Sequence, residues 1–326
     1  MTMRTVSFGR TGLSVSNLCF GTMTFGGEAD AKTSEEIYSA CRDAGITFFD
    51  CANLYNGGRS EEILGDLIAS ERDELVITSK VGMRFSSASA LNRGGNNRRH
   101  ILMSVENSLR RLKTDRLDVL FLHRWDDDTP LEESLRALED LVRAGKVIHT
   151  GVSNFTSWQT ATALGIQRRN GWQAFDVIQP MYNLIKRQAE VEILPHAMAE
   201  GLAVISYGPN AGGVLTGKYR GSKVPEGVRL DLNKGYAKRY ADDYYMTTAS
   251  AFVELADEIG MHPVTLAVAW AAHHPAITCP IIGARNVEQL KPSLAAADFE
   301  MTDALYDRIT ALTRPLPSPT DRDEEG

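Results

Sequence analysis

Cysteine is scarce in this sequence of 326 residues, and long apolar runs are missing. The four cysteines stand in apolar stretches without C-x-x-C spacing, which favours buried thiols over disulfides or a metal site: Cys19, Cys41, Cys51 and Cys279. No apolar run approaches the roughly 20 residues that cross a bilayer, and the N-terminus lacks the apolar region of a signal peptide. Because 35 Lys and Arg face 42 Asp and Glu, the net charge of −7 offers no attraction for nucleic-acid backbones or anionic lipids. We therefore predict a cytoplasmic protein that has neither a membrane nor a nucleic acid as partner.

Common signatures of nucleotide and metal sites are also missing. A doubly wound dinucleotide-binding fold would show G-x-G-x-x-G directly after an early strand, and the sequence has none there. Residues 212–218 (GGVLTGK) have the spacing of a phosphate-binding P-loop, but Tyr219 replaces the Ser or Thr that would bind Mg²⁺. The seven histidines form no H-E-x-x-H pattern, which argues against a metal hydrolase.

The chain instead alternates short β-branched or aromatic runs with longer segments of helical periodicity. The short runs predict eight strands, near residues 18–22, 46–50, 75–81, 117–123, 147–152, 175–179, 202–206 and 277–282. Helical patterns between them include residues 34–44, 60–70, 99–112, 131–144, 157–167 and 189–200. One strand and one helix in every 30–40 residues or so, repeated eight times, is typical of an α/β protein of the (β/α)8 TIM-barrel class.

No linker or change of composition divides the chain, so we predict one domain over residues 1–314. It should begin with a β-hairpin around Thr11 and Gly12, and the Pro-rich and then acidic residues 315–326 should be a disordered tail. Residues 208–246 form a long Gly-, Lys- and Tyr-rich stretch after the seventh strand. Long loops inside compact domains are usually functional lids or disordered segments, and we favour a lid here.

Polar residues end three successive apolar strands. Asp50 closes ITFFD, Lys80 closes LVITSK and His123 closes LDVLFLH, while Tyr55 lies in the turn after Asp50. Because the carboxyl ends of barrel strands meet at one face, these side chains are expected to lie together. Taken singly, each could equally be a strand-end group that touches water, but three in succession favour a site.

The chemistry of this group suits proton transfer. A tyrosine has an ordinary pKa of about 10, and an adjacent ammonium such as that of Lys80 stabilises its phenolate and lowers this value. Asp50 would keep Lys80 charged and oriented, and His123 would donate a hydrogen bond to a carbonyl oxygen. Such a group delivers a proton to a carbonyl that gains negative charge, so a cofactor must supply the hydride.

Seven motifs stand in the order and spacing that resemble aldo-keto reductases: FDCANLY, TSKVG, LDVLFLH, GVSNF, QPMYNL, LTGKY and IIGARNVEQL. The resemblance extends over roughly residues 4–312. Members of this family are (β/α)8 barrels that use NADPH to reduce aldehydes and ketones, so the resemblance implies NADPH/NADP⁺ as cofactor and a small carbonyl compound as substrate. It implies a catalytic tetrad of Asp50, Tyr55, Lys80 and His123, with Tyr55 as proton donor.

The resemblance also implies a row of cofactor contacts. Ser153, Asn154 and Gln179 would hydrogen-bond the nicotinamide carboxamide, and Tyr207 would stack on its ring. The segment beside the nicotinamide ribose matches Gly21, Thr22, Met23 and Asp50. The pyrophosphate would be held by Gly208, Pro209, Asn210, Ala211, Gly212, Leu215, Lys218 and Arg229, and the adenosine end by Gly283, Arg285, Gln289 and Ser293. Without the motifs, these residues also fit turns, strand ends or packing positions.

Arg285 is predicted to open a helix directly after the eighth strand. There both the guanidinium and the helix N-terminus favour a phosphate, which implies a preference for NADPH over NADH. The chain departs from the usual family pattern at Cys51, at Asn210, which stands where Leu is common, and at Pro292-Ser293, which replaces a Glu-Asn pair near adenine.

The substrate is set by loops, which vary without changing the catalytic group. Substrate contacts are expected from Tyr55, His123 and Trp125, with Trp125, Phe25 and Phe85 forming an apolar rim. A homo-oligomer is possible. The rival interpretation is a cofactor-binding regulatory subunit that resembles potassium-channel β subunits, because such subunits share this barrel.

Overall fold

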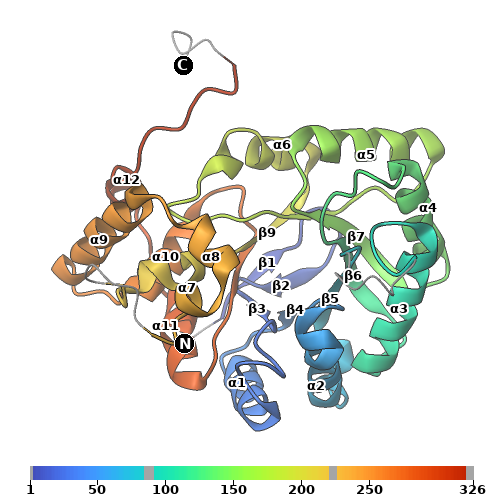
Figure 1. Cartoon of the computed structure of the whole chain (residues 1–326), viewed down its shortest axis with the longest axis horizontal. Helices are drawn as coiled ribbons and strands as arrows, with labels where there is room; N and C mark the ends of the chain where they lie inside the picture. Colours follow the sequence, from blue (N-terminus) through green and yellow to red (C-terminus); the bar gives the residue numbers. More distant parts are fainter. Residues whose placement is uncertain (1–2, 84–91, 220–225, 321–326) are drawn as a thin grey trace.

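The computed structural model describes residues 3–83, 92–219 and 226–320, with the side chain of Arg229 left out, and shows a closed barrel surrounded by helices (Figure 1). The barrel consists of parallel strands in the order β10-β3-β4-β5-β6-β7-β8-β9. Their bounds are β3 (Cys19–Gly21), β4 (Phe48–Asp50), β5 (Val76–Val81), β6 (Leu117–Leu122), β7 (Val147–Ser153), β8 (Val177–Gln179), β9 (Ala203–Tyr207) and β10 (Cys279–Ile282). The predicted (β/α)8 TIM barrel is confirmed, with its strands in sequential order around the barrel.

An antiparallel hairpin precedes the barrel, as expected. It consists of β1 (Thr5–Ser7) and β2 (Ser14–Ser16), and Phe8 and Val15 are fully buried in one cluster with strand residues of the barrel. The Phe8 ring packs edge-on against Phe48, with centroids 5.4 Å apart. Gly9 approaches Ala203 at the start of β9, so the hairpin covers the amino ends of the strands and leaves the carboxyl ends free for a site.

Helices connect the strands and place their apolar faces against the barrel. They are α1 (Ala31–Asp43), α2 (Arg59–Ile68), α3 (Arg98–Leu112), α4 (Leu131–Arg143), α5 (Ser157–Asn170), α6 (Ile193–Glu200), α10 (Pro263–His273), α11 (Val287–Leu294) and α12 (Asp303–Thr310), with the short helices η2 (Arg72–Glu74), η3 (Gln188–Glu190) and η5 (Ala295–Ala297). Most of these bounds differ from expectation by a few residues, and two of the differences have a clear physical reason. Helix α5 continues to Gly171, whose φ of +64° ends it, and the predicted helix 189–200 is split because Pro195 suits only the first turn of a helix.

Helices occupy much of the described part of segment 208–246, which corrects its description as a loop. It contains η4 (Ala211–Thr216), α7 (Arg229–Leu232), α8 (Lys234–Arg239) and the start of α9 (Asp243–Glu258). The side chains of Asn233 and Asp242 cap α8 and α9, and Leu230 and Tyr240 are buried. Local caps and buried apolar residues thus order a stretch that composition alone marked as irregular. In Figure 1, α7 and α8 lie between β9 and α11.

Other expectations concern termini, thiols and metals. All four cysteines are buried and free. Residues 315–320 carry no helix or strand, and the rest of the predicted tail lies outside the described residues. Within the described ranges, no helix is both long and apolar enough to span a bilayer, and no cluster of three metal-ligating side chains occurs.

Candidate active site

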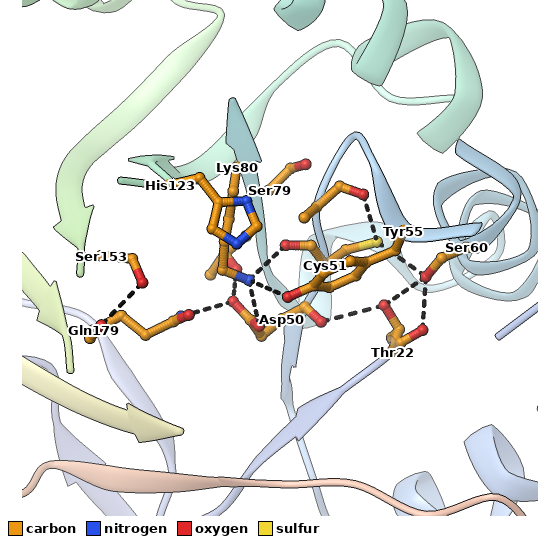
Figure 2. A network of polar contacts seen from close by, with 12 residues as sticks. Thr22, Asp50, Cys51, Tyr55, Ser60, Ser79, Lys80, His123, Ser153 and Gln179 are labelled. Atoms are coloured by element: carbon orange, nitrogen blue, oxygen red, sulfur yellow. Dashed lines mark hydrogen bonds and ion pairs between the residues drawn. The ribbon is translucent and has the colours of Figure 1, made fainter. Parts of the chain in front are cut away.

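The polar strand ends converge at the carboxyl end of the barrel, as the sequence predicts (Figure 2). Asp50 is the last residue of β4, Lys80 is the penultimate residue of β5, and His123 directly follows β6. Tyr55 begins the short helix η1 (Tyr55–Gly58) after β4. Lys80 Nζ lies 2.5 Å from Asp50 Oδ2, 2.8 Å from the Cys51 carbonyl oxygen and 3.3 Å from Tyr55 Oη. The ammonium therefore donates to three oxygens at once.

Neighbouring donors satisfy the rest of the buried carboxylate. Asp50 Oδ1 accepts hydrogen bonds from Thr78 Oγ1 at 2.7 Å and from Gln179 Nε2 at 2.9 Å. Lys80 is completely buried and Asp50 is 3% exposed. A buried ion pair needs such additional hydrogen bonds to offset the loss of water, so this set holds Lys80 charged at a fixed position.

The pKa values of this group follow from burial and charge. Burial opposes the charge on Lys80, but Asp50 and Tyr55 more than compensate, and the pKa of Lys80 lies above its usual value. Burial raises the pKa of Tyr55 to about 12, and the Lys80 ammonium offsets this only in part. The sequence predicts a lowered pKa for Tyr55. The net shift is upward because loss of water outweighs the nearby cation, so the phenol remains protonated at neutral pH.

His123 is neutral in this environment. Burial, followed by the charges of Lys80 and Arg124, lowers the pKa of His123 to about 3. Its ring meets that of Tyr55 edge-on, with centroids 6.1 Å apart. Its Nδ1 is buried and has no partner among the described residues. A neutral imidazole carries one N–H donor, which suits a hydrogen bond to a substrate oxygen without proton transfer.

A second network lies behind the site and was not predicted from the sequence. The Ser60 hydroxyl donates to the Thr22 carbonyl oxygen at 2.7 Å and lies 3.3 Å from Cys51 Sγ, while Thr22 Oγ1 donates to the Asp50 carbonyl oxygen (Figure 2). Thr22, expected beside the cofactor ribose, is instead completely buried in this network. The contacts tie α2 to the ends of β3 and β4, which fixes the backbone of the catalytic group.

A cavity of about 860 Å³ opens over these residues. Of the predicted site residues, those that line it are Gly21, Met23, Asp50, Tyr55, His123, Ser153, Asn154, Gln179, Tyr207, Gly208, Pro209, Asn210, Gly212, Lys218, Gly283, Arg285 and Gln289. The cavity therefore connects the Tyr55 region with the cationic region of Lys218 and Arg285.

Hydrogen bonds to the main chain and to each other fix the polar side chains predicted to contact the nicotinamide. Asn154 Nδ2 donates to the His123 carbonyl oxygen at 2.9 Å, and Asn154 Oδ1 accepts from the Tyr207 hydroxyl at 2.7 Å. The Ser153 hydroxyl donates to the Gln179 carbonyl oxygen at 2.9 Å. These contacts hold polar side chains at the cavity wall.

Several predicted residues do not line the cavity. Ala211, Leu215 and Ser293 are completely buried behind its wall, and the Phe25 ring lies in the core against Phe20. Trp125 packs edge-on against Phe155 and Trp158 instead. Two of the three rings expected at an apolar rim thus pack against other aromatic rings. Phe85 and the side chain of Arg229 lie outside the part of the chain that the structure describes.

Sequence reasoning also missed residues of the cavity wall: Thr24, Leu54, Met83, Gly213, Thr216, Tyr236, Arg239, His262, Val264, Asn286 and Glu288. Most of these lie within a few positions of a predicted residue, so proximity along the chain could have found them. Tyr236 and Arg239 come from α8, inside the stretch 208–246, but no motif singled them out. His262 and Val264, at the start of α10, had no signal in the sequence.

Arg285 lies just before its helix, not in it. The helix α11 begins at Val287, and the Asn286 side chain caps it by accepting from the Gln289 N–H. The Arg285 N–H donates to Gln289 Oε1 at 3.3 Å, and its guanidinium donates to the Gly227 carbonyl oxygen at 3.4 Å. Arg285 remains next to the helix N-terminus at the cavity wall, although Asn286 takes the capping position.

The cavity wall fits a dinucleotide. Gly208 has a φ of +73°, and a Cβ built there would meet nothing within 4 Å. A Cβ on Gly283 would approach only the Gly21 carbonyl oxygen, at 3.7 Å. Bare backbone of this kind lets a phosphate or ribose come close, while Lys218 and Arg285 add positive charge.

Comparison with known proteins is consistent with this geometry. A sequence model of the Aldo/keto reductase family matches residues 17–314. The chain belongs to the aldo/keto reductase family. An Arabidopsis thaliana protein named "Probable voltage-gated potassium channel subunit beta" is 35% identical over 324 residues, covering 97% of this chain and 98% of that protein. The Bacillus subtilis "Uncharacterized oxidoreductase YrpG" is 37% identical over 307 residues and 90% of each chain. The Emericella nidulans "Norsolorinic acid reductase stcV" is 33% identical, covering 90% of this chain and 76% of that protein.

Proposed function

We propose that this protein reduces an aldehyde or ketone to an alcohol with NADPH as hydride donor, and that Tyr55 is the proton donor. The observation that carries the proposal is the Tyr55 hydroxyl, which is 3.3 Å from a buried ammonium and faces a cavity with cationic residues farther along its wall. Family membership and relatives named as reductases support it. The four free thiols fit the cytoplasmic location expected from the sequence.

The chain's own groups suit the two ends of such a cofactor. Ser153, Asn154 and Gln179 present the hydroxyl and amides that a nicotinamide carboxamide needs, and Lys218 and Arg285 present cations for its phosphates. Tyr207 offers a ring beside them. When bound, the reduced nicotinamide supplies a hydride to the carbonyl carbon.

The catalytic tetrad supplies the proton to the carbonyl oxygen. Neutral His123 donates a hydrogen bond that orients the carbonyl oxygen, and the Tyr55 hydroxyl transfers its proton to that oxygen. The Lys80 ammonium stabilises the developing phenolate, which has lost its water to burial. Asp50 keeps Lys80 charged and aimed at Tyr55.

The test is turnover by the purified full chain. NADPH absorbance is followed with a panel of aldehydes and ketones, and Tyr55→Phe serves as the matched control, because it removes only the hydroxyl. Consumption of NADPH by the wild type and its loss in Tyr55→Phe is the expected result. If the wild type binds NADPH and reduces no carbonyl compound, the enzymatic proposal fails.

A second candidate is a regulatory subunit that retains the cofactor. The names of the Arabidopsis relative and of a rice relative favour it, the latter 34% identical over 328 residues and 98% of this chain. Tight binding of NADPH without turnover in the assay above would favour this function over catalysis.

A further inference from the structure

Arg239 ends α8 and lines the same cavity; it lies in the stretch 208–246, although no motif singled it out. Its guanidinium carbon lies 4.8 Å from the centre of the Tyr236 ring. That ring in turn faces the glycine turn of η4, since a Cβ on Gly212 would come within 2.6 Å of it. Lys238, the preceding residue, is exposed. Tyr236 therefore contacts both Arg239 and the glycine turn of residues 212–213.

Arg239 differs from most partly buried arginines of the described chain. Others are paired with carboxylates, namely Arg42 with Glu71, Arg72 with Asp118, Arg98 with Asp140, Arg111 with Glu61, Arg116 with Asp73 and Arg187 with Glu190. Within the described ranges, Arg239 has no carboxylate partner, and Arg285 shares this property. Both exceptions line the cavity.

The carboxylates of the cavity wall are occupied elsewhere. Asp50 pairs with Lys80, and Glu288 pairs with Lys291 at 2.5 Å. Residues 220–225 (RGSKVP) lie outside the described ranges, but they contain no acidic residue and so offer no carboxylate to Arg239. Burial raises the pKa of Tyr207, and Arg239 is the main charge that opposes this, so its field reaches the nicotinamide side of the proposed site. The guanidinium of a partly buried arginine that has no carboxylate partner can form charge-assisted hydrogen bonds with a bound anion.

We propose that Arg239 binds an anionic oxygen group, a phosphate or a carboxylate, that lies in the cavity beside Gly212 and Lys218. The proposal rests on the proposed function, which provides two sources of this chemistry. One is the diphosphate of the dinucleotide, and the other is an acidic group on the carbonyl substrate.

The test uses three variants of the full chain. Arg239→Gln removes the charge, Arg239→Lys keeps the charge without the planar fork, and Lys238→Gln removes a neighbouring exposed charge as the matched control. NADPH binding to the cofactor-free protein is measured by fluorescence titration at low and high salt. KM is measured for benzaldehyde and for 4-carboxybenzaldehyde, which differ by one carboxylate.

Each source predicts its own result. If the diphosphate is bound, Arg239→Gln weakens NADPH binding by about tenfold or more and flattens its salt dependence, while the ratio of the two KM values stays constant. If a substrate carboxylate is bound, NADPH binding is unchanged and KM rises by about tenfold or more for 4-carboxybenzaldehyde alone. In either case Arg239→Lys recovers part of the effect and Lys238→Gln matches the wild type.

The outcomes also separate this inference from the proposed function. If the wild type binds NADPH and reduces both aldehydes while Arg239→Gln behaves like Lys238→Gln, the anion site is wrong and the proposed function stands. If the wild type does not bind NADPH, both are overturned.

Discussion

Replacing Lys80 by methionine removes a buried cation from between Asp50 and Tyr55 and keeps a side chain of similar length. Lys80 Nζ is 3.3 Å from Tyr55 Oη. Two unit charges at that distance, in an effective dielectric constant of about 20, interact by roughly 5 kcal/mol. Since about 1.4 kcal/mol is a factor of ten in rate, loss of this interaction with a full phenolate would lower the rate by roughly 10³- to 10⁴-fold. Because Tyr55 carries only part of that charge in the transition state, Lys80→Met should lower kcat by about 10²- to 10³-fold.

The same substitution affects folding, and this effect needs its own control. Removing one partner of a buried ion pair costs about 3–5 kcal/mol, because the other charge stays buried. The double variant Asp50→Asn with Lys80→Met removes both charges. We expect it to recover much of the free energy of unfolding, measured by urea denaturation, without recovering activity.

The assay compares NADPH oxidation, NADPH affinity and the pH dependence of the reverse reaction. Alcohol oxidation needs the Tyr55 phenolate as base, so its rate rises with pH toward the pKa of Tyr55. Without the ammonium that pKa is higher, and the rise should move to higher pH in Lys80→Met. A folded variant that binds NADPH and turns over within tenfold of the wild type, with an unchanged pH profile, would refute the role of Lys80.

Four further predictions follow from the site. Tyr55→Phe should lower kcat by about 10²- to 10⁴-fold with little change in NADPH affinity; near-normal turnover would exclude Tyr55 as the acid. Carbonyl reduction should be insensitive to pH from about 5 to about 9, since the pKa values of about 3 for His123 and about 12 for Tyr55 leave both groups neutral there; an apparent pKa near 6.5 in kcat would contradict this. Arg285→Ala should weaken NADPH binding by roughly 10- to 150-fold and leave NADH binding nearly unchanged; equal losses for both cofactors would show that Arg285 does not read the 2′-phosphate. NADP⁺ should slow amide hydrogen exchange in residues 208–246, because a lid is protected when it closes on its ligand; identical exchange with and without NADP⁺ would exclude a lid.

The sequence alone determined the barrel and the meeting of the polar strand ends. Strand and helix periodicities are local properties, and parallel strands in a closed barrel bring their carboxyl ends to one face. Asp50, Lys80 and His123 could therefore be placed together from their positions at the ends of apolar runs. Tyr55 followed from its place in the turn after Asp50.

Only the tertiary structure decided the balance of forces at that face. The direction of the Tyr55 pKa shift depends on how much water burial removes, and no motif measures that. Trp125 packs against Phe155 and Trp158 from other segments, so its absence from the cavity could not be predicted from local sequence. Arg239 reaches the cavity because Asn233 caps α8 and Tyr236 rests on a glycine turn, and such contacts exist only once distant parts of the chain have packed together.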